Sequence, residues 1–248
     1  MKKLNIILSL LILFALSVNA EIKSDSSKVI HGHKNLIKIN LPALALRTYA
    51  LEYERAIGRK TAASFGFRLM PKGGIPLQGT IDNLIDDPET SKQLNSFEIS
   101  NQAFTPQIKF YFGKDIFKGF YLAPFARFAN YKVNGDFNFD VNGTEEIIPL
   151  DGELTTITGG LEIGVQFRMG KHIHLNFNFG PQFGSSKGDF NGRKNLNTQE
   201  QDALRDDLED FKIPFVEQEI TVNSTGVNMK VDGPWGGLKG GIMLGYRF

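Results

Sequence analysis

Two pairs of histidines are the residues of this chain best suited to bind a metal ion: His31 with His33, and His172 with His174. Residues i and i+2 of a β-strand point to the same face, so His172 and His174 could present two imidazoles to one ion. A zinc site needs a third and a fourth ligand, and nothing in the sequence nominates them. We therefore expect polar histidines at the start of a strand, and predict no metal site and no cofactor.

Three glutamates, Glu52, Glu54 and Glu162, could act as general acids or bases. Hydrolytic enzymes also need a nucleophile with a base placed beside it, and Ser64 is the one obvious serine on the same strand faces. Lysines and arginines outnumber the glutamates on those faces. This balance favours salt bridges over a carboxylic acid with a raised pKa. We predict that the chain is not an enzyme.

The segment 198–211 has the spacing of a short amphipathic helix, with Leu204, Leu208 and Phe211 at i, i+4 and i+7. Thr198 followed by Gln201 fits a capping box at its start. The acidic face of the helix could bind calcium or a basic partner, although a solvated face is the preferred interpretation. That face comprises Asp202, Asp206, Glu209 and Asp210; Asp82, Asp86, Asp87 and Glu89 form a similar acidic group earlier in the chain.

The first twenty residues predict a cleaved signal peptide. Lys2 and Lys3 precede an apolar run over 6–16 that is too short to span a bilayer, and Val18-Asn19-Ala20 suits a signal peptidase. A permanent membrane anchor is the alternative. Cleavage after Ala20 changes the net charge from +1 to −1, and this near-neutrality argues against nucleic-acid binding. The absence of cysteine excludes lipid attachment at cysteine, disulfides and thiolate metal sites.

Eight segments alternate between apolar and polar residues, the pattern of β-strands with one apolar face. The composition, with 26 glycines and 21 phenylalanines, also favours strands and turns. The predicted strands are 37–41, 49–54, 64–69, 104–112, 120–131, 157–167, 172–183 and 238–248. Short connections (58–60, 113–119 and 170–171) alternate with long ones (71–100, 132–153 and 185–234). This predicts an all-β fold, an eight-stranded antiparallel up-and-down transmembrane β-barrel with short periplasmic turns and long extracellular loops.

The polar faces are predicted to point into the barrel and the apolar faces toward lipid. An eight-stranded barrel is just wide enough for side chains to fill, and the many Phe, Leu and Ile residues would overfill it if they pointed inward. With the polar faces inside, opposite charges can pair across the lumen. The predicted lumen charge network is Lys38, Glu52, Glu54, Arg68, Lys109, Arg127, Glu162, Arg168, Lys239 and Arg247.

The last strand carries a recognisable signature. Ile242, Leu244, Tyr246 and the terminal Phe248 resemble the signal read by the outer-membrane barrel assembly machinery. The segment 35–70 resembles small barrels of unknown function common in Bacteroidota and, more loosely, the OmpA transmembrane-domain and OmpX superfamily. The resemblance implies an outer-membrane location, with membrane lipids, lipopolysaccharide and the assembly machinery as partners. It implies no catalytic residue.

We therefore expect residues 1–20 to be a signal peptide, 21–33 a periplasmic segment and 34–248 a monomeric outer-membrane barrel. Its expected role is structural, or the binding of an unidentified partner by its extracellular loops. Two alternatives stay open at this point. One is a narrow channel for small solutes with a hydrated basic lumen, and the other is a soluble periplasmic lipid-binding barrel of the calycin type.

Overall fold

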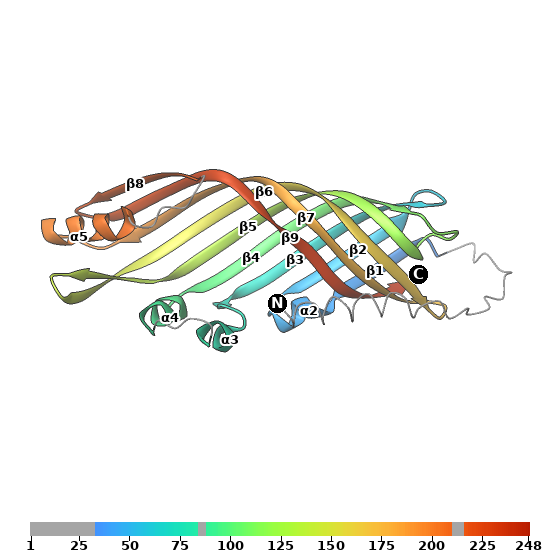
Figure 1. Cartoon of the computed structure of the whole chain (residues 1–248), viewed down its shortest axis with the longest axis horizontal. Helices are drawn as coiled ribbons and strands as arrows, with labels where there is room; N and C mark the ends of the chain where they lie inside the picture. Colours follow the sequence, from blue (N-terminus) through green and yellow to red (C-terminus); the bar gives the residue numbers. More distant parts are fainter. Residues whose placement is uncertain (1–32, 84–87, 210–215) are drawn as a thin grey trace, which may run out of the picture. The chain divides into compact units, whose positions relative to one another are not determined.

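The strands form a closed antiparallel ring. The computed structural model describes residues 33–83, 88–209 and 216–248. Neighbours pair in the order β1-β2-β3-β4-β5-β6-β7-β9, and β1 pairs with β9 to close the ring of eight, as predicted (Figure 1). A ninth strand, β8, pairs with β9 only. The strands are β1 (Asn35–Asn40), β2 (Tyr49–Ala56), β3 (Thr61–Gly74), β4 (Glu98–Tyr111), β5 (Gly119–Val141), β6 (Thr144–Met169), β7 (Ile173–Arg193), β8 (Glu217–Asn223) and β9 (Gly226–Arg247).

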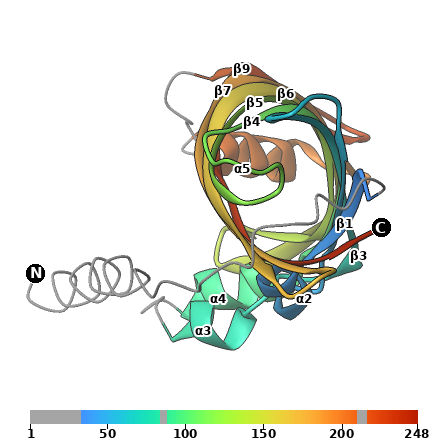
Figure 2. The ribbon, with the colours of Figure 1, turned by 90° about the vertical axis from the view of Figure 1, so that its right-hand side faces the viewer.

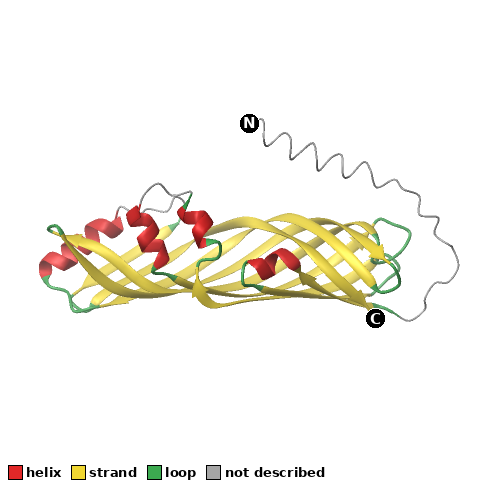
Figure 3. Cartoon of the chain, turned by 90° about the horizontal axis from the view of Figure 1, so that it is seen from below, coloured by secondary structure: helices red, strands yellow, loops and turns green. Residues whose placement is uncertain are grey.

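The two ends of the barrel differ. Residues 57–60, 112–118 and 170–172 form tight connections at one end, which we call the short-turn end. The described residues form four short helices in the connections on the opposite side, which we call the long-loop end. They are α2 (Leu41–Ala45), α3 (Gln78–Asp82), α4 (Pro88–Asn95) and α5 (Thr198–Glu209). Of these, α5 lies at the tip of the long-loop end, whereas α2 lies about midway along the barrel (Figure 1 and Figure 3). None of the helices in the described part of the chain is long and apolar enough to cross a bilayer. The predicted signal peptide lies outside the described residues, as does the segment 21–33 apart from His33.

Much of the sequence predicted as long loops is strand. β1 and β2 have 6 and 8 residues, whereas β5, β6, β7 and β9 have 21 to 26 and continue far past the ring. The predicted loop 132–153 is a hairpin, in which Val141 pairs with Thr144. The predicted loop 185–234 contains the ends of β7 and β9 together with α5 and β8. We call this continuation of β5, β6, β7 and β9, with β8, the extension.

The turn of the β5–β6 hairpin follows from its two central residues. Asn142 and Gly143 have φ values of +54° and +85°, the left-handed backbone of a type I′ turn. Only glycine adopts this conformation without strain, and asparagine tolerates it better than most residues. The pair Asn-Gly therefore joins the two long strands by a two-residue turn.

Side chains in the extension reverse the pattern of the ring. In the ring, apolar side chains point outward and polar ones inward. In the extension, the inner face is apolar and α5 packs against it, inside the barrel outline as viewed in Figure 2. The resulting core contains Phe139, Ile148, Leu196, Leu204, Leu208 and Val227. The outer face there carries residues such as Lys132, Glu153 and Lys187, all exposed. The extension is therefore built like a water-soluble sheet that covers its own core.

The predicted helix at 198–211 is present as α5 over Thr198–Glu209, but its cap lies one residue earlier than expected. The backbone N–H of Glu200 donates to Asn197 Oδ1 at 2.9 Å, and the N–H of Asn197 donates to Glu200 Oε2 at 2.6 Å. This reciprocal pair is a capping box formed by Asn197 and Glu200, because asparagine is at least as good a cap as threonine. Leu204 and Leu208 are buried as the spacing predicted, and Phe211 lies outside the described residues.

Candidate functional site: a polar, ion-paired lumen

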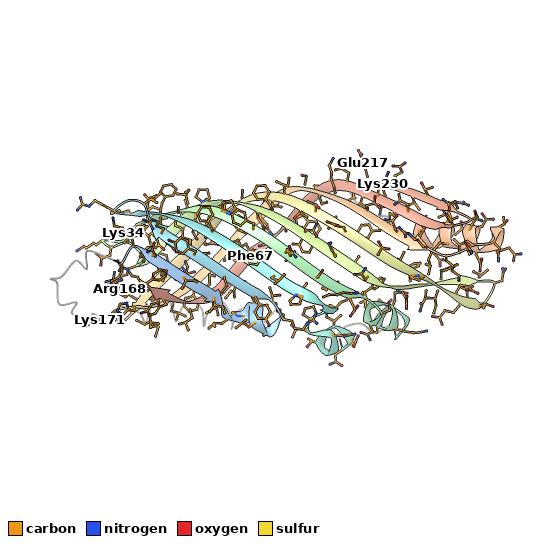
Figure 4. All side chains as sticks on the ribbon, turned by 180° about the vertical axis from the view of Figure 1, so that it is seen from behind. Lys34, Phe67, Arg168, Lys171, Glu217 and Lys230 are labelled. Atoms are coloured by element: carbon orange, nitrogen blue, oxygen red, sulfur yellow. The ribbon has the colours of Figure 1, made fainter. Side chains whose placement is uncertain are left out.

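The outer wall of the ring is apolar. Phe67, Phe104, Ile163 and Leu244, from four different strands, are each between 41% and 58% exposed, and Figure 4 shows Phe67 on the wall of the barrel. The inward side chains of the same strands include fully buried lysines and glutamates. A soluble barrel has the opposite arrangement, with apolar side chains inside and charges in water. The wall therefore faces lipid.

Two lysines and two glutamates form one ionic cluster in the lumen. Lys38 Nζ lies 2.6 Å from Glu52 Oε1 and 2.5 Å from Glu54 Oε2. Lys109 Nζ lies 2.6 Å from Glu52 Oε1 and 3.4 Å from Glu54 Oε2. All four side chains are at most 4% exposed. Such burial is tolerable because each charge is neutralised by two of the opposite sign.

Small residues on β3 allow this cluster to form. Lys109 on β4 and Glu52 on β2 are separated by β3, so their side chains must cross that strand. Lys109 pairs with Ala62 and Glu52 pairs with Gly66. Neither Ala62 nor Gly66 rises far from the sheet, and the lysine passes above β3 to the carboxylate. Polar neighbours complete the cluster: Gln107 Nε2 donates to Glu52 Oε2 at 2.9 Å.

A second ionic pair uses the same geometry on the other side of the barrel. Lys239 on β9 reaches over β7 to contact Glu162 on β6. Between them lies Gly180, where a Cβ atom would stand 2.3 Å from the backbone oxygen of Leu161, so only glycine fits. Tyr121 Oη donates to Glu162 Oε1 at 2.9 Å, and its ring lies 4.6 Å from Lys109 Nζ, which links the two clusters. We call the two clusters together the ionic plug.

Phe117 closes the short-turn end of the lumen. It lies in the connection between β4 and β5, yet it is fully buried, and its φ of +62° turns the chain inward. Its ring packs against Tyr111 and His174, and the Arg247 guanidinium lies 5.3 Å from its centre. Its carbonyl oxygen accepts a hydrogen bond from Gln166 Nε2 at 3.0 Å. Phe117 and the ionic plug therefore both lie in the short-turn half of the lumen.

The remaining residues of the predicted lumen network lie in two other places. Arg168 is exposed at the short-turn end, near Lys34 and Lys171 in Figure 4, so it does not join the buried network. The reason is its position next to the last residue of β6, where the wall ends. Arg247 sits at the same mouth, donating from Nε to the backbone oxygen of His33 at 2.8 Å. Arg68 and Arg127 lie deeper, on the long-loop side of the ionic plug, lining one pocket with Lys239.

The histidines do not converge on a common point. His174 Nδ1 lies 3.1 Å from the Phe117 carbonyl oxygen, whereas His172 Nδ1 lies 3.0 Å from that of Arg247. His33 contacts His172 edge to face, and His31 lies outside the described residues. Within the described ranges, no group of three or more potential metal ligands is found.

Several lumen residues were not nominated from the sequence. Tyr111, Tyr121, Gln166 and Asn176 are buried and hydrogen-bond to one another or to the glutamates. They occupy inward positions of predicted strands, so the alternation pattern alone could have predicted that they line the lumen. They were not predicted because only charged residues were included in the network. Phe117 could not be found this way, since it lies in a turn.

The terminal signature faces outward. Ile242, Leu244, Tyr246 and Phe248 are 39% to 49% exposed and lie on the lipid-facing side of β9. Phe248 is tied to β1, because its backbone N–H donates to the Asn35 oxygen at 2.9 Å and its own oxygen accepts from the Asn35 N–H at 3.0 Å. The end of the chain is thus part of the seam that closes the ring.

A closed antiparallel ring with an apolar outer wall and an ion-paired interior defines a transmembrane β-barrel. The chain belongs to the family DUF3575, described as a protein of unknown function, whose model matches residues 8–202. The comparison with curated proteins returned no match. Among solved structures, the chain is similar to the crystal structure of Acinetobacter baumannii CarO, with 10% identity and a TM-score of 0.34, covering 82% of this chain and 97% of that one. At that score, the fold assignment depends on the strand pairings of this chain alone.

Proposed function

We propose that this protein is a non-catalytic outer-membrane barrel whose ring is a sealed anchor and whose extension is a binding platform outside the cell. The observation that carries the proposal is the reversal of side-chain alternation along β5 and β6. Outward Phe128 and Ile157 face lipid and pair with each other. Outward Lys132 and Glu153, four residues nearer the β5–β6 turn on each strand, also pair but carry charges. A strand face that changes so abruptly from apolar to charged marks the edge of the membrane.

The sealed lumen favours an anchor over a channel. An eight-stranded barrel has little free interior, and here Phe117 and the ionic plug occupy it at the short-turn end. The apolar wall likewise disfavours a soluble lipid-binding barrel, which would expose that wall to water. We infer that the short turns are periplasmic, as in bacterial barrels generally, and that the extension is extracellular.

The extension offers a polar surface for a partner. A hollow of about 450 Å³ opens on it between β7, β8 and β9, lined by Lys187, Asp189, Glu217, Lys230 and Asp232 among others. Figure 4 shows Glu217 and Lys230 at this end. The mixed charges favour a polar partner over an apolar one. Outward Ile242, Leu244, Tyr246 and Phe248 would be read by the barrel assembly machinery, and the finished barrel would sit as a monomer among membrane lipids and lipopolysaccharide, as do small barrels of the OmpA and OmpX type and those of Bacteroidota.

Epitope tags at opposite ends of the barrel test this proposal. One tag is inserted between Asn142 and Gly143 at the tip of the β5–β6 hairpin, and the matched control tag between Arg59 and Lys60 in a short turn. We expect antibody to label intact cells carrying the first tag only, and both tags after permeabilisation, with both proteins in the outer-membrane fraction. Labelling of the Arg59 tag on intact cells would overturn the orientation. Steady conductance of the purified protein in planar bilayers would overturn the sealed lumen.

A further inference from the structure

The lumen contains a pocket immediately above the ionic plug. Its volume is about 240 Å³, and its lining includes Arg68, Arg127, Lys239, Asn101, Asn178 and Gln182. Tyr131 also lines it and packs against Trp235 from across the lumen, with 5.7 Å between ring centres. The pocket thus lies between the charged floor formed by the plug and an aromatic pair on its long-loop side.

Arg68 and Arg127 have no counter-charge in this pocket. Their Nε atoms are buried without a hydrogen-bond partner, and neither side chain forms a salt bridge with a described residue. The lining contains no carboxylate. The lysines of the plug present a clear contrast, since each contacts at least one glutamate. Because both guanidinium groups line the same pocket, their like charges repel each other, and an anion between them would relieve that repulsion.

Small side chains keep this part of the lumen open. Arg68 on β3 pairs with Ala103 on β4, which pairs in turn with Ala129 on β5. Both alanines point inward and are 4% exposed. Arg127 lies two residues from Ala129 on the same face of β5. The pocket itself is lined by two further small residues, Ala50, which pairs with Arg68, and Gly66.

We propose that Arg68 and Arg127 form a binding site for an oxyanion, a carboxylate or phosphate group. Guanidinium is planar and presents paired N–H donors that match the oxygens of either group, so two arginines can hold one anion from two sides. The amides of Asn101, Asn178 and Gln182 can donate further hydrogen bonds. The volume is below the ~300 Å³ at which pockets for drug-sized ligands begin, so the ligand is a small anion or a single charged group.

The pocket borders a gap in the strand pairing of the barrel wall. On the side of β9 that faces β1, pairing with β8 ends at Asp232 and pairing with β1 begins only at Met243. Gly240 and Leu238, on the unpaired stretch between them, line the pocket together with Asn40. The oxyanion could thus be a free solute that enters from the long-loop end, or a lipid headgroup that enters through this gap. The chemistry recognised is the same for both.

Titration with inorganic phosphate tests the site directly. Trp235 is the only tryptophan of the chain and contacts a pocket residue, so its fluorescence reports on the pocket. In purified full-length protein in a neutral detergent and phosphate-free buffer, we expect a saturable change in Trp235 fluorescence and a rise in the thermal midpoint. Arg68→Gln and Arg127→Gln should each weaken phosphate binding at least tenfold, and Arg127→Lys, which keeps the charge without the paired donors, by less. Arg59→Gln, in an exposed turn, is the matched control and should bind as the wild type does.

Repeating the titration in nanodiscs distinguishes a free anion from a lipid headgroup. If the occupant is a lipid headgroup, discs containing phosphatidylglycerol should block phosphate binding relative to pure phosphatidylcholine discs. If it is a free anion, phosphate should bind equally in both. Without anion, Arg127→Gln should have a higher thermal midpoint than the wild type, because one of two like charges that line the same pocket is gone. Wild-type protein that responds neither to phosphate nor to phosphatidylglycerol, or a doubly substituted variant that responds like the wild type, would overturn the proposal.

Discussion

At the scale of single residues, the lumen contains two kinds of inward-pointing cation: fully buried lysines and partly buried arginines. Lys38 and Lys109 are neutralised by glutamates within the protein, whereas Arg68 and Arg127 have no partner among the described residues. The difference matters because removing one member of a buried ion pair leaves an uncompensated charge, but removing an unpaired charge relieves a cost. Substitutions in the two groups should therefore change stability in opposite directions.

Lys109→Met tests the paired group. The substitution leaves Glu52 and Glu54 with Lys38 alone, so one carboxylate loses its counter-charge, and we expect the free energy of unfolding to fall by about 3–5 kcal/mol. Urea unfolding in detergent, followed by heat-modifiable gel mobility, measures this loss. The control Lys72→Met removes an exposed pair with Glu98, at 56% and 51% exposure, and should cost roughly 0–1 kcal/mol. Adding Glu52→Gln to Lys109→Met should recover part of the loss; a further loss would contradict this account of the plug.

At the scale of elements, the ring strands were predictable and the extension was not. Phe104 to Phe112 alternates without interruption, so a period of two identified the strand and both of its faces. In β5, by contrast, the apolar face changes from outward to inward beyond Phe128, so the outward-apolar pattern that predicted the ring strands ends there. The Asn142-Gly143 pair was a sufficient signal for the hairpin. The ion pairs could not be predicted from the sequence. Lys239 contacts Glu162 across an intervening strand, and the alternation of residues does not give the register between strands.

Leu204→Asp tests whether the extension folds around α5. Leu204 is fully buried in the core of the extension, and a carboxylate there would be removed from water among apolar side chains, so we expect α5 to detach. Limited proteolysis should then cut within 194–225, while heat-modifiable mobility of the ring stays unchanged because the ring has its own ionic interior. Asp206→Ala, on the exposed face of α5, is the control and should leave the protease pattern as in the wild type. Loss of the folded ring in Leu204→Asp would show that the two parts do not fold separately.

At the scale of the whole molecule, a lipid-facing ring and a water-facing extension share four continuous strands. The types of the outward residues already distinguish the lipid-facing part of each strand from the water-facing part. Only the strand register shows where the ring ends and the extension begins. Phe128 pairs with Ile157, and Lys132 pairs with Glu153, so the boundary falls at the same level on both β5 and β6. A boundary that is level between neighbouring strands is the expected signature of a planar membrane surface.

Single cysteines can locate that boundary, because the natural chain contains none to interfere. We expect Phe128→Cys and Ile157→Cys to resist a membrane-impermeant maleimide in intact cells, since lipid covers both positions. Lys132→Cys and Glu153→Cys should react, because they lie only four residues away but in water. All four should react after unfolding in sodium dodecyl sulfate, which controls for expression. Equal labelling at 128 and 132 would place both in water and refute the lipid-facing ring, whereas protection at both would move the membrane edge into the extension and leave its charged outer face without a physical explanation.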